Sequence, residues 1–201
     1  MENNFDKILN EIKQFAAENF VPIVREETQK HLVQTIQNVK PKQILEIGTA
    51  IGYSGILMLS NCEEGTHLTT IELIEKRFEK AKQNFEKVGF ASQVTQIFDD
   101  AFKAISQQKE NSFDFIFLDG PKGQYANYLP ILKKLLKPNG VLFADDVLYR
   151  GMVLSDEYPK HKERRIVLGL RAFLQNLMQD NDFETKLFEI EDGFTISKKI
   201  K

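Results

Sequence analysis

Cysteine is nearly absent from the chain: Cys62 is the only one in 201 residues. One cysteine excludes an internal disulfide framework and any zinc site built on several cysteines. Long apolar runs are absent too, and no segment approaches 18 consecutive apolar residues, so no membrane-spanning helix is expected. The first residues show no basic region followed by an apolar run, which argues against a signal peptide. These absences favour a cytoplasmic protein.

An excess of charge of one sign is also lacking. The chain has 27 Lys and Arg against 29 Asp and Glu, a formal net charge of −2, so it has no global attraction to nucleic acid or anionic membranes. The composition, 42% hydrophobic and 28% charged, is that of a soluble globular protein. The length suits one domain with a sizeable core. We expect a single domain over residues 1–201, with residues 1–38 as an N-terminal helical extension.

Hydrophobic spacing predicts two helices followed by a regular alternation of strands and helices. The N-terminal helices cover residues 4–19 and 25–38, with an extended break around Pro22. Their apolar faces need a partner, either the helices of the sheet or a second subunit. The predicted strands cover residues 43–47, 67–72, 94–98, 113–119 and 141–145. The helices between and after them cover residues 52–60, 74–88, 101–107, 124–136 and 161–179.

The C-terminal pattern differs from the rest. Two strands, 184–190 and 194–198, flank Asp192-Gly193, a dipeptide typical of hairpin turns. The five preceding strands alternate with helices, which indicates a parallel sheet covered on both faces. The predicted fold is therefore α/β and Rossmann-like, with a seven-stranded, mostly parallel sheet and a C-terminal antiparallel hairpin. In such sheets, ligands bind beyond the carboxyl ends of the strands.

A glycine-rich turn follows the first predicted strand, with glycines at positions 48, 52 and 55. Gly48 allows a sharp turn and a close approach of a ligand, and the N-terminus of the next helix favours a negative group. This pattern predicts a nucleotide-type pocket. A dinucleotide site requires Gly-x-Gly-x-x-Gly, but three residues separate Gly48 from Gly52, so the second glycine is missing. No Gly-Lys-Ser/Thr follows, which excludes a P-loop.

Acidic residues at the strand ends narrow the choice of nucleotide. Glu46 lies in an otherwise apolar strand, and the ammonium group of S-adenosylmethionine would explain a carboxylate there. Glu72 ends the second strand, where it can accept both ribose hydroxyls. Asp100 and Ala101 end the third strand, where an adenine edge would lie. The alternative is that glycines and acids at strand ends are ordinary turn chemistry.

Four motifs, in this order, cover nearly the whole chain: Leu45-Glu46-Ile47-Gly48-Thr49-x-x-Gly52-Tyr53-Ser54, Thr70-Ile71-Glu72, Phe113-Asp114-Phe115-Ile116-Phe117-Leu118-Asp119 and Val141-Leu142-Phe143-Ala144-Asp145-Asp146. Through them the chain resembles class I methyltransferases, and more narrowly the metal-dependent O-methyltransferases of the catechol and caffeoyl-CoA type. The resemblance implies S-adenosylmethionine as cofactor and adds Tyr53, Ser54 and Asp119 to its contacts. It also implies that the fourth strand lies beside the first and the fifth beside the fourth, and that the protein is a homodimer.

Asp119 ends the fourth strand, and Asp145 and Asp146 end the fifth; we call these three residues the acidic cluster. If the two strands are neighbours, their ends are about 5 Å apart. Three uncompensated carboxylates at that separation are costly, and a hard divalent cation, Mg²⁺, Mn²⁺ or Ca²⁺, would neutralise them. The alternative is that these acids cap the helices that follow.

The predicted chemistry follows from this cluster. A substrate hydroxyl that binds the cation loses its proton more easily, and the oxyanion then attacks the sulfonium methyl group. Lys122, three residues after Asp119, could take the proton, and the resemblance gives the matching lysine that catalytic role; the alternative is a solvated surface lysine. Two positions depart from the family, which usually has asparagine at Asp146 and often alanine at Gly120.

Two segments bear on the substrate: Lys122-Gly123-Gln124-Tyr125 and Lys162-Glu163-Arg164-Arg165. They resemble a bacterial subgroup that methylates 5-hydroxyuridine at the wobble position of tRNA, giving 5-methoxyuridine. Independently, residues 160–171 hold five Lys and Arg against one acid, a patch that could contact phosphates. Tyr125 or Tyr149 could stack on a splayed base.

Other interpretations remain open for this surface and for the function. A charge run is often only the solvated face of a helix, and the net charge counts against RNA. The substrate could also be a small catechol or phenol. In a third interpretation the chain binds S-adenosylmethionine without catalysis and acts through partners.

Overall fold

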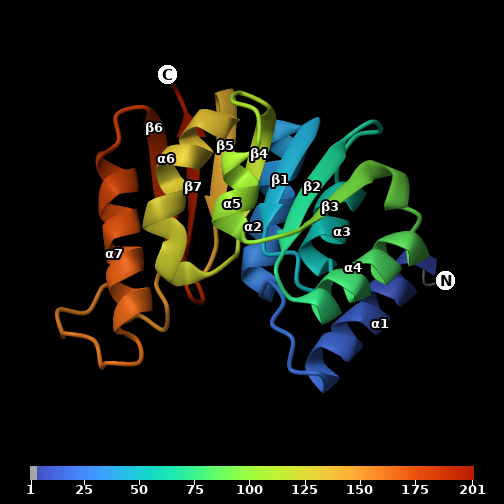
Figure 1. Cartoon of the computed structure of the whole chain (residues 1–201), viewed down its shortest axis with the longest axis horizontal. Coiled ribbons are helices and arrows are strands. Elements are labelled where there is room, and N and C mark those ends of the chain that lie inside the picture. Colours follow the sequence, from blue (N-terminus) through green and yellow to red (C-terminus); the bar gives the residue numbers. More distant parts are fainter. Residues whose placement is uncertain (1–3) are drawn as a thin grey trace.

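The computed structural model describes residues 4–201, which form one sheet between two layers of helices (Figure 1). The helices are α1 (Asn4–Glu18), α2 (Glu26–Val39), α3 (Tyr53–Ser60), α4 (Glu75–Lys87), α5 (Ala101–Ser106), α6 (Tyr125–Leu135) and α7 (Arg164–Gln179). The strands are β1 (Gln43–Ile47), β2 (His67–Glu72), β3 (Val94–Phe98), β4 (Phe113–Leu118), β5 (Leu136–Ala144), β6 (Phe183–Phe188) and β7 (Phe194–Lys199). Short 3₁₀ helices, η1 (Ala91–Gln93) and η2 (Lys122–Gln124), precede β3 and α6.

The sheet has seven strands in the order β3-β2-β1-β4-β5-β7-β6. Strands β1 to β5 are parallel, whereas β7 lies antiparallel between β5 and β6. The fold class and the implied order of β1, β4 and β5 are therefore confirmed. The chain first winds outward from β1 to β3 and then returns to β4 on the other side of β1. The sheet thus has its topological switch between β1 and β4.

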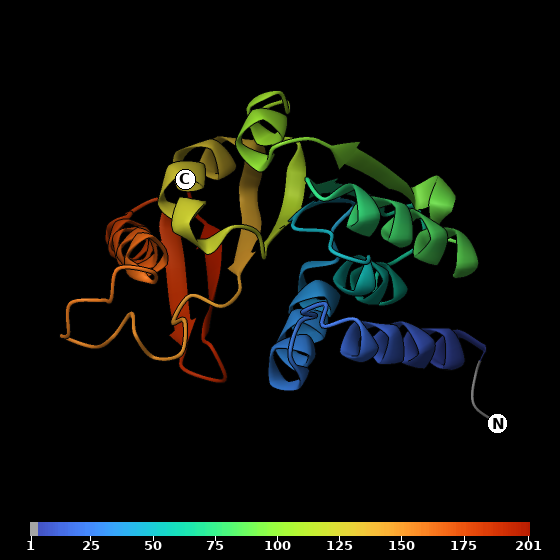
Figure 2. The same cartoon turned by 60° about the horizontal axis from the view of Figure 1, so that its bottom comes forward.

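Two apolar cores fill the two sides of the sheet. Helices α5, α6 and α7 cover one side, and α1 to α4 cover the other (Figure 2). Leu32 and Ile36 of α2 are fully buried in the same core as Phe117 and Phe143 of the sheet. The apolar faces of the N-terminal helices thus find their partner in the sheet and α3. Within residues 4–201, no helix is long and apolar enough to cross a membrane.

The largest difference from the predicted elements is in β5, which begins at Leu136 rather than at residue 141. Leu136 pairs with Phe113 and Val141 pairs with Phe115, so the register shifts between them. Residues 137–140 form the extra length that this shift requires, and Asn139 has a φ of 64° there. Helix α7 begins at Arg164 rather than at residue 161. Neither 3₁₀ helix was predicted, because three residues carry too little periodicity.

Candidate active site

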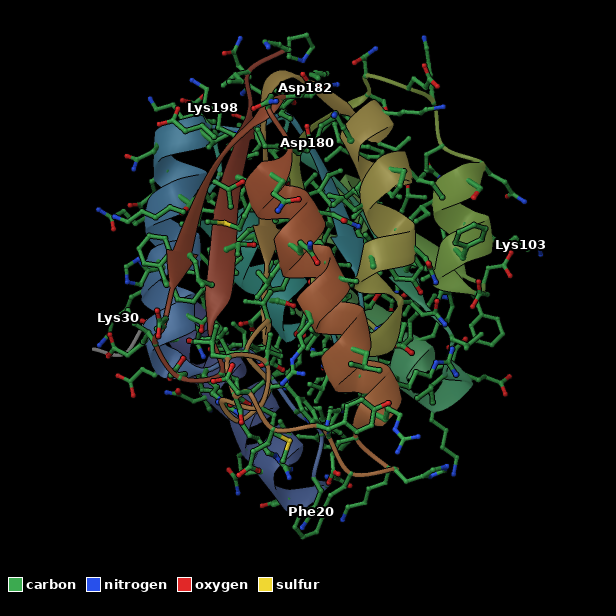
Figure 3. The ribbon with its side chains drawn as sticks, turned by 90° about the vertical axis from the view of Figure 1, so that its left-hand side faces the viewer. Phe20, Lys30, Lys103, Asp180, Asp182 and Lys198 are labelled. Atoms are coloured by element: carbon green, nitrogen blue, oxygen red, sulfur yellow. The ribbon has the colours of Figure 1, made fainter. Side chains whose placement is uncertain are left out.

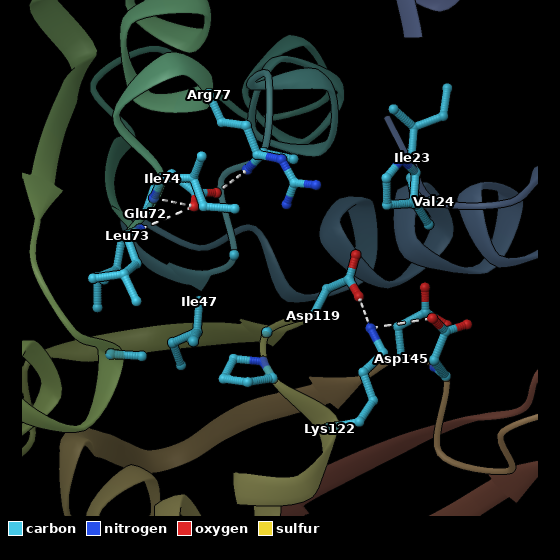
Figure 4. Close-up of a pocket in the computed structure, with 18 of the residues that line it drawn as sticks. Ile23, Val24, Ile47, Glu72, Leu73, Ile74, Arg77, Asp119, Lys122 and Asp145 are labelled. Atoms are coloured by element: carbon cyan, nitrogen blue, oxygen red, sulfur yellow. Dashed lines mark hydrogen bonds and ion pairs between the residues drawn. The ribbon is translucent and has the colours of Figure 1, made fainter. Parts of the chain in front are cut away.

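A cavity of about 680 Å³ opens at the carboxyl ends of the parallel strands (Figure 4). It lies at the topological switch between β1 and β4, where open α/β sheets bind ligands. Each of the five parallel strands contributes a residue at its end or in the loop after it: Gly48, Glu72, Asp100, Asp119 and Asp145. Residues 22–25, between α1 and α2, form a further wall. The volume is in the range of small-molecule and cofactor sites.

Gly48 brings two strand ends into close contact. Its φ is +102°, and a Cβ built on it would lie 2.3 Å from the carbonyl oxygen of Asp119. A side chain here would therefore push the turn after β1 away from the loop after β4. The amides of Gly48 and Thr49 both donate to the carbonyl of Ile71, at 3.1 Å each, so the turn is also fixed to β2. Gly48 lines the cavity as well, next to Ala50.

Glu72 is held rigidly at the cavity wall, as the dashed lines in Figure 4 show. Its Oε2 accepts the amide of Ala50 at 2.9 Å. Its Oε1 accepts the amides of Leu73 and Ile74 at 2.9 and 2.8 Å. Three backbone donors fix the carboxylate in one orientation, which is the preorganisation that a ribose-binding acid needs.

Asp100 and Ala101 lie at the same end of the cavity as Glu72. The Oδ1 atom of Asp100 accepts the amide of Lys103 at 3.2 Å, so the side chain also caps α5. The predicted ligand contact of Asp100 and the alternative of ordinary turn chemistry are both compatible with this position.

Glu46 lies behind the cavity wall rather than in it. Its carboxylate is fully buried and accepts hydrogen bonds from Ser54 Oγ at 2.5 Å and Thr70 Oγ1 at 2.6 Å. Thr70 Oγ1 in turn lies 2.5 Å from Thr49 Oγ1. Burial raises the pKa of Glu46 to about 7, which the two hydroxyl donors only partly offset. Tyr53 is also buried, with its hydroxyl on Gln29 Oε1 at 3.0 Å. Cofactor contact by Glu46, Tyr53 and Ser54 stays a prediction.

Replacing Glu46 with glutamine is expected to flatten the dependence of stability on pH. The folded-state pKa of about 7 lies above the ordinary value of 4.5, so ionisation of Glu46 costs stability as the pH rises from about 4.5 to about 7. Above pH 7 the cofactor-free variant should be more stable than the wild type by roughly 3 kcal/mol, and near pH 4.5 the difference should vanish. Urea unfolding across this range measures it. The control is Glu86→Gln, because Glu86 is exposed on α4. If Glu46→Gln changed the free energy of unfolding by the same amount at every pH, the raised pKa of Glu46 would be refuted.

Lys122 lies among the acidic cluster at the other end of the cavity (Figure 4). Its Nζ is 2.5 Å from Asp119 Oδ1 and 3.1 Å from Asp146 Oδ2. Asp145 is buried, and its Oδ1 accepts the amide of Asp146 at 2.7 Å. The predicted convergence of Asp119, Lys122, Asp145 and Asp146 is present in the structure. The alternative of a fully solvated Lys122 is wrong, because its side chain is only 19% exposed.

The electrostatics of this cluster are dominated by burial. Burial raises the pKa of Asp145 well above its usual value, and the charges of Asp119 and Asp146 raise it further. Burial also raises the pKa of Asp119, an effect that Lys122 opposes. Burial alone would lower the pKa of Lys122, but the acidic groups around it, Tyr125 first and then Asp119 and Asp146, outweigh burial and raise it. Lys122 is therefore an ammonium ion here, not a free base.

A divalent cation remains a prediction. Among residues 4–201, no group of three or more His, Cys, Asp or Glu side chains is placed to hold a metal ion. In the acidic cluster, the ammonium of Lys122 lies between two of the three carboxylates.

Residues 2–200 match the family model described as "O-methyltransferase". This chain belongs to the O-methyltransferase family. Caffeoyl-CoA O-methyltransferase 1 of Zea mays is 30% identical over 177 residues, which cover 83% of this chain and 67% of that protein. Catechol O-methyltransferase of Niastella koreensis is 33% identical over 147 residues, covering 72% and 65%. The crystal structure of an O-methyltransferase from Bacillus cereus in complex with SAH superposes with a TM-score of 0.86 at 27% identity, covering 96% of this chain and 91% of that chain.

One predicted substrate residue of this O-methyltransferase is wrong. The ring of Tyr125 is fully buried and packs edge-on against Phe173. Its hydroxyl donates to the carbonyls of Leu118 and Asp145, at 3.0 and 3.2 Å. Tyr125 therefore cannot stack on a substrate base. It fixes the ends of β4 and β5, which carry the acidic cluster.

The predicted basic patch divides into two groups. Arg164 and Arg165 are exposed at the start of α7 and do not line the cavity, but Arg165 lies directly against Gly123, one residue from Lys122. Arg171 instead turns inward, where its guanidinium donates to four carbonyls of the loop after β5: Met152, Val153, Ser155 and Glu157. Arg171 is thus a loop anchor and is not available for phosphates.

Several cavity residues of this methyltransferase were not predicted. Arg25 lines the cavity and its guanidinium lies 2.5 Å from Asp192 Oδ2, while Asp192 Oδ1 accepts the amide of Arg150. The hairpin turn thus joins two cavity walls that are far apart in sequence, and no local pattern indicates such a contact. Arg77, in the first turn of α4, also lines the cavity. Its position in the first turn of the helix after β2 was an available signal.

Proposed function

We propose that this O-methyltransferase transfers the methyl group of S-adenosylmethionine to an acidic hydroxyl group. The observation that carries the proposal is one cavity with a rigid carboxylate, Glu72, at one end and Lys122 with the acidic cluster at the other. The likeness to a structure in complex with SAH, the demethylated form of the cofactor, supports it. The bond from sulfur to the methyl carbon breaks as the bond to the substrate oxygen forms, and the hydroxyl proton is lost.

We assign the cofactor to the part of the cavity between Gly48 and Ala101. Glu72 accepts the ribose hydroxyls, and Asp100 and Ala101 contact the adenine. This orientation directs the sulfonium end toward Asp119, which follows β4 beside the turn at Gly48. The substrate hydroxyl then lies next to Lys122, which we assign as its proton acceptor. Because Lys122 is an ammonium ion in the free protein, it can accept this proton only after its ion pairs with Asp119 and Asp146 are broken and it has released its own proton to solvent.

The donor chemistry of the acidic cluster fits a hard divalent cation such as Mg²⁺, Mn²⁺ or Ca²⁺. Three carboxylates line one wall, and Asp145 is buried without an ion-pair partner among the described residues. Asp119 and Asp145 would hold the cation, with Asp146 as a third candidate. When bound, the cation would stabilise the substrate oxyanion and lower the pKa of the hydroxyl. Loss of turnover in EDTA, with S-adenosylmethionine affinity retained in calorimetry, tests this assignment.

We propose 5-hydroxyuridine at the wobble position of tRNA as the substrate. Arg164 and Arg165 are exposed cations at the start of α7, and Arg165 lies against Gly123, next to the proposed proton acceptor. Tyr158 is 68% exposed, and the guanidinium of Arg164 lies 4.9 Å from its ring centroid. Single-stranded RNA is bound by such combinations of cations and open aromatic rings. The test is transfer of the methyl group to an anticodon stem-loop carrying 5-hydroxyuridine.

The double substitution Arg164→Ala plus Arg165→Ala is expected to weaken binding of this stem-loop and to reduce the salt slope of log K by about 2, because two phosphate contacts are lost. Filter binding from 50 to 200 mM salt measures it. The control is Lys134→Ala plus Lys198→Ala, because both lysines are exposed and neither lines the cavity. Lys134 lies in the last turn of α6, and Lys198 lies on β7 (Figure 3). An equal loss of affinity in both double variants would show that the stem-loop is attracted by general positive charge and not bound at Arg164 and Arg165.

A small catechol or phenol is the second candidate substrate. The similarity to proteins named caffeoyl-CoA and catechol O-methyltransferase favours it, as does a cavity of about 680 Å³. The two candidates are separated by comparing kcat/KM on catechol and on the stem-loop under identical conditions. Activity on catechol with none on RNA would overturn the tRNA assignment and keep the O-methyltransferase chemistry.

A further inference from the structure

Lys122 is the one cation in direct contact with the acidic cluster among the described residues. Its Nζ lies 2.5 Å from Asp119 Oδ1 and 3.1 Å from Asp146 Oδ2, and all three side chains are at most 30% exposed. The lysine comes from η2, three residues after Asp119, so the contact is built into the loop that follows β4. Lys122 therefore supplies the positive charge that these carboxylates need when nothing else is bound.

An ammonium ion and a hard divalent cation compete for the same kind of ligand, a carboxylate oxygen. The two cations cannot both lie between Asp119 and Asp146, because positive charges at that separation repel each other strongly in a half-buried site. We propose that the ammonium of Lys122 fills the cation position of the free enzyme, so that Lys122 and a divalent cation occupy the acidic cluster in turn. This inference rests on the proposed function, since it concerns the same cluster.

Asp146 has a specific part in this exchange. The resemblance leads one to expect an asparagine at this position, and an amide would leave Lys122 held by Asp119 alone. The carboxylate of Asp146 adds a second ion pair to the lysine. Asp146 is therefore a positioning residue for Lys122, and its negative charge favours the lysine-filled state as well as the cation-filled state. A cation that binds the cluster therefore has to displace Lys122 from Asp146 as well as from Asp119.

A double-mutant cycle on Mn²⁺ affinity tests the exchange, because coupling between two residues is visible only in such a cycle. The four proteins are the full-length wild type, Lys122→Met, Asp146→Asn and the double variant, each titrated with Mn²⁺ by calorimetry without substrate. Lys122→Met should bind Mn²⁺ at least about tenfold more tightly than the wild type, because the competing charge is removed. The same substitution in the Asp146→Asn background should give a clearly smaller gain.

Lys133 provides the matched control, because it is also a half-buried lysine between two aspartates. Its Nζ lies 2.8 Å from Asp180 Oδ2 and 2.7 Å from Asp182 Oδ2, at the far end of α7 (Figure 3). Lys133→Met should leave Mn²⁺ affinity unchanged. An unchanged or weaker affinity in Lys122→Met overturns the proposal, as does an equal gain in both Asp146 backgrounds, which would indicate a distant charge effect without exchange. Binding of Mn²⁺ by none of the four proteins also overturns it.

The outcome is separable from that of the proposed substrate. Mn²⁺ affinity is measured without RNA, phenol or turnover, so failure to methylate the stem-loop leaves the cycle intact. Conversely, the effects of Lys122→Met and Asp146→Asn on Mn²⁺ affinity could prove additive while methyl transfer is active. That result would reject the exchange of Lys122 with the cation but leave the O-methyltransferase function standing.

Discussion

Lys122→Met is expected to lower kcat for methyl transfer by about 10²–10⁴-fold, the usual contribution of a positioned proton acceptor. The affinity for S-adenosylmethionine should change little, because the lysine lies at the opposite end of the cavity from Glu72 and Ala101. Methionine keeps the length of the side chain and its apolar contacts but cannot accept a proton. Single-turnover kinetics and a cofactor titration measure the two effects separately.

The control for this substitution is again Lys133→Met. It removes a lysine from between two aspartates at the other end of α6 and α7, roughly 15–20 Å along α7 from the residues that contact Gly123. It should cost some stability and leave kcat unchanged. If Lys122→Met kept more than a tenth of wild-type kcat at saturating substrate, the proton-acceptor role would have to be abandoned. Tighter Mn²⁺ binding combined with lost turnover would separate the two roles of Lys122.

The convergence of Asp119 and Asp145 could be predicted because it depends on the strand order, which the resemblance implies. Parallel neighbouring strands end at the same edge, so an acid after β4 and an acid after β5 have to meet there. Glu72 and Asp100 follow from the same rule at the ends of β2 and β3. In each case the residue lies within two positions of a strand end, and the position of the strand is set by its apolar pattern.

The sequence did not predict the directions of some side chains or the contacts between segments that are distant in the chain. Tyr125 lies in a polar-looking segment, but η2 shortens the loop and rotates its ring into the core beneath α7. Arg171 belongs to the basic run by sequence, yet its guanidinium satisfies loop carbonyls. Arg25 and Asp192 are 167 residues apart and meet only because the hairpin turn packs on the start of α2. Neither local propensity nor spacing contains this information.

The ion pairs of Lys122 show a third limit of prediction from the sequence. The sequence indicates that a lysine and three acids share one wall, but it does not indicate whether the lysine points toward the acids or toward the substrate. The contact distances decide this for the free protein and make Lys122 the counter-ion of Asp119 and Asp146. The proton-acceptor role that the resemblance gives to Lys122 thus acquires a condition: the lysine first has to leave its ion pairs and release its own proton.

Asp145→Asn should lower the methyl-transfer activity but raise the stability of the fold. Asp145 is 5% exposed, forms no ion pair among the described residues and faces the charges of Asp119 and Asp146. An amide of the same shape can still accept the amide of residue 146 and removes the repulsion, so the cation-free protein should gain about 1 kcal/mol. Methyl transfer should fall by about 10²–10³-fold, because the proposed cation that would stabilise the developing oxyanion loses a ligand.

Asp146→Asn is the matched control, because it introduces the same chemical change one residue away. It restores the pair of residues that the resemblance leads one to expect, so turnover should stay within a factor of about ten of the wild type. Urea unfolding and kcat are measured on both variants without and with Mn²⁺. If Asp145→Asn lost stability and activity together, Asp145 would be a structural residue and the cation assignment would lose its central ligand. If Asp145→Asn gained stability while losing activity, the buried charge of Asp145 would serve the reaction, because that charge destabilises the folded protein.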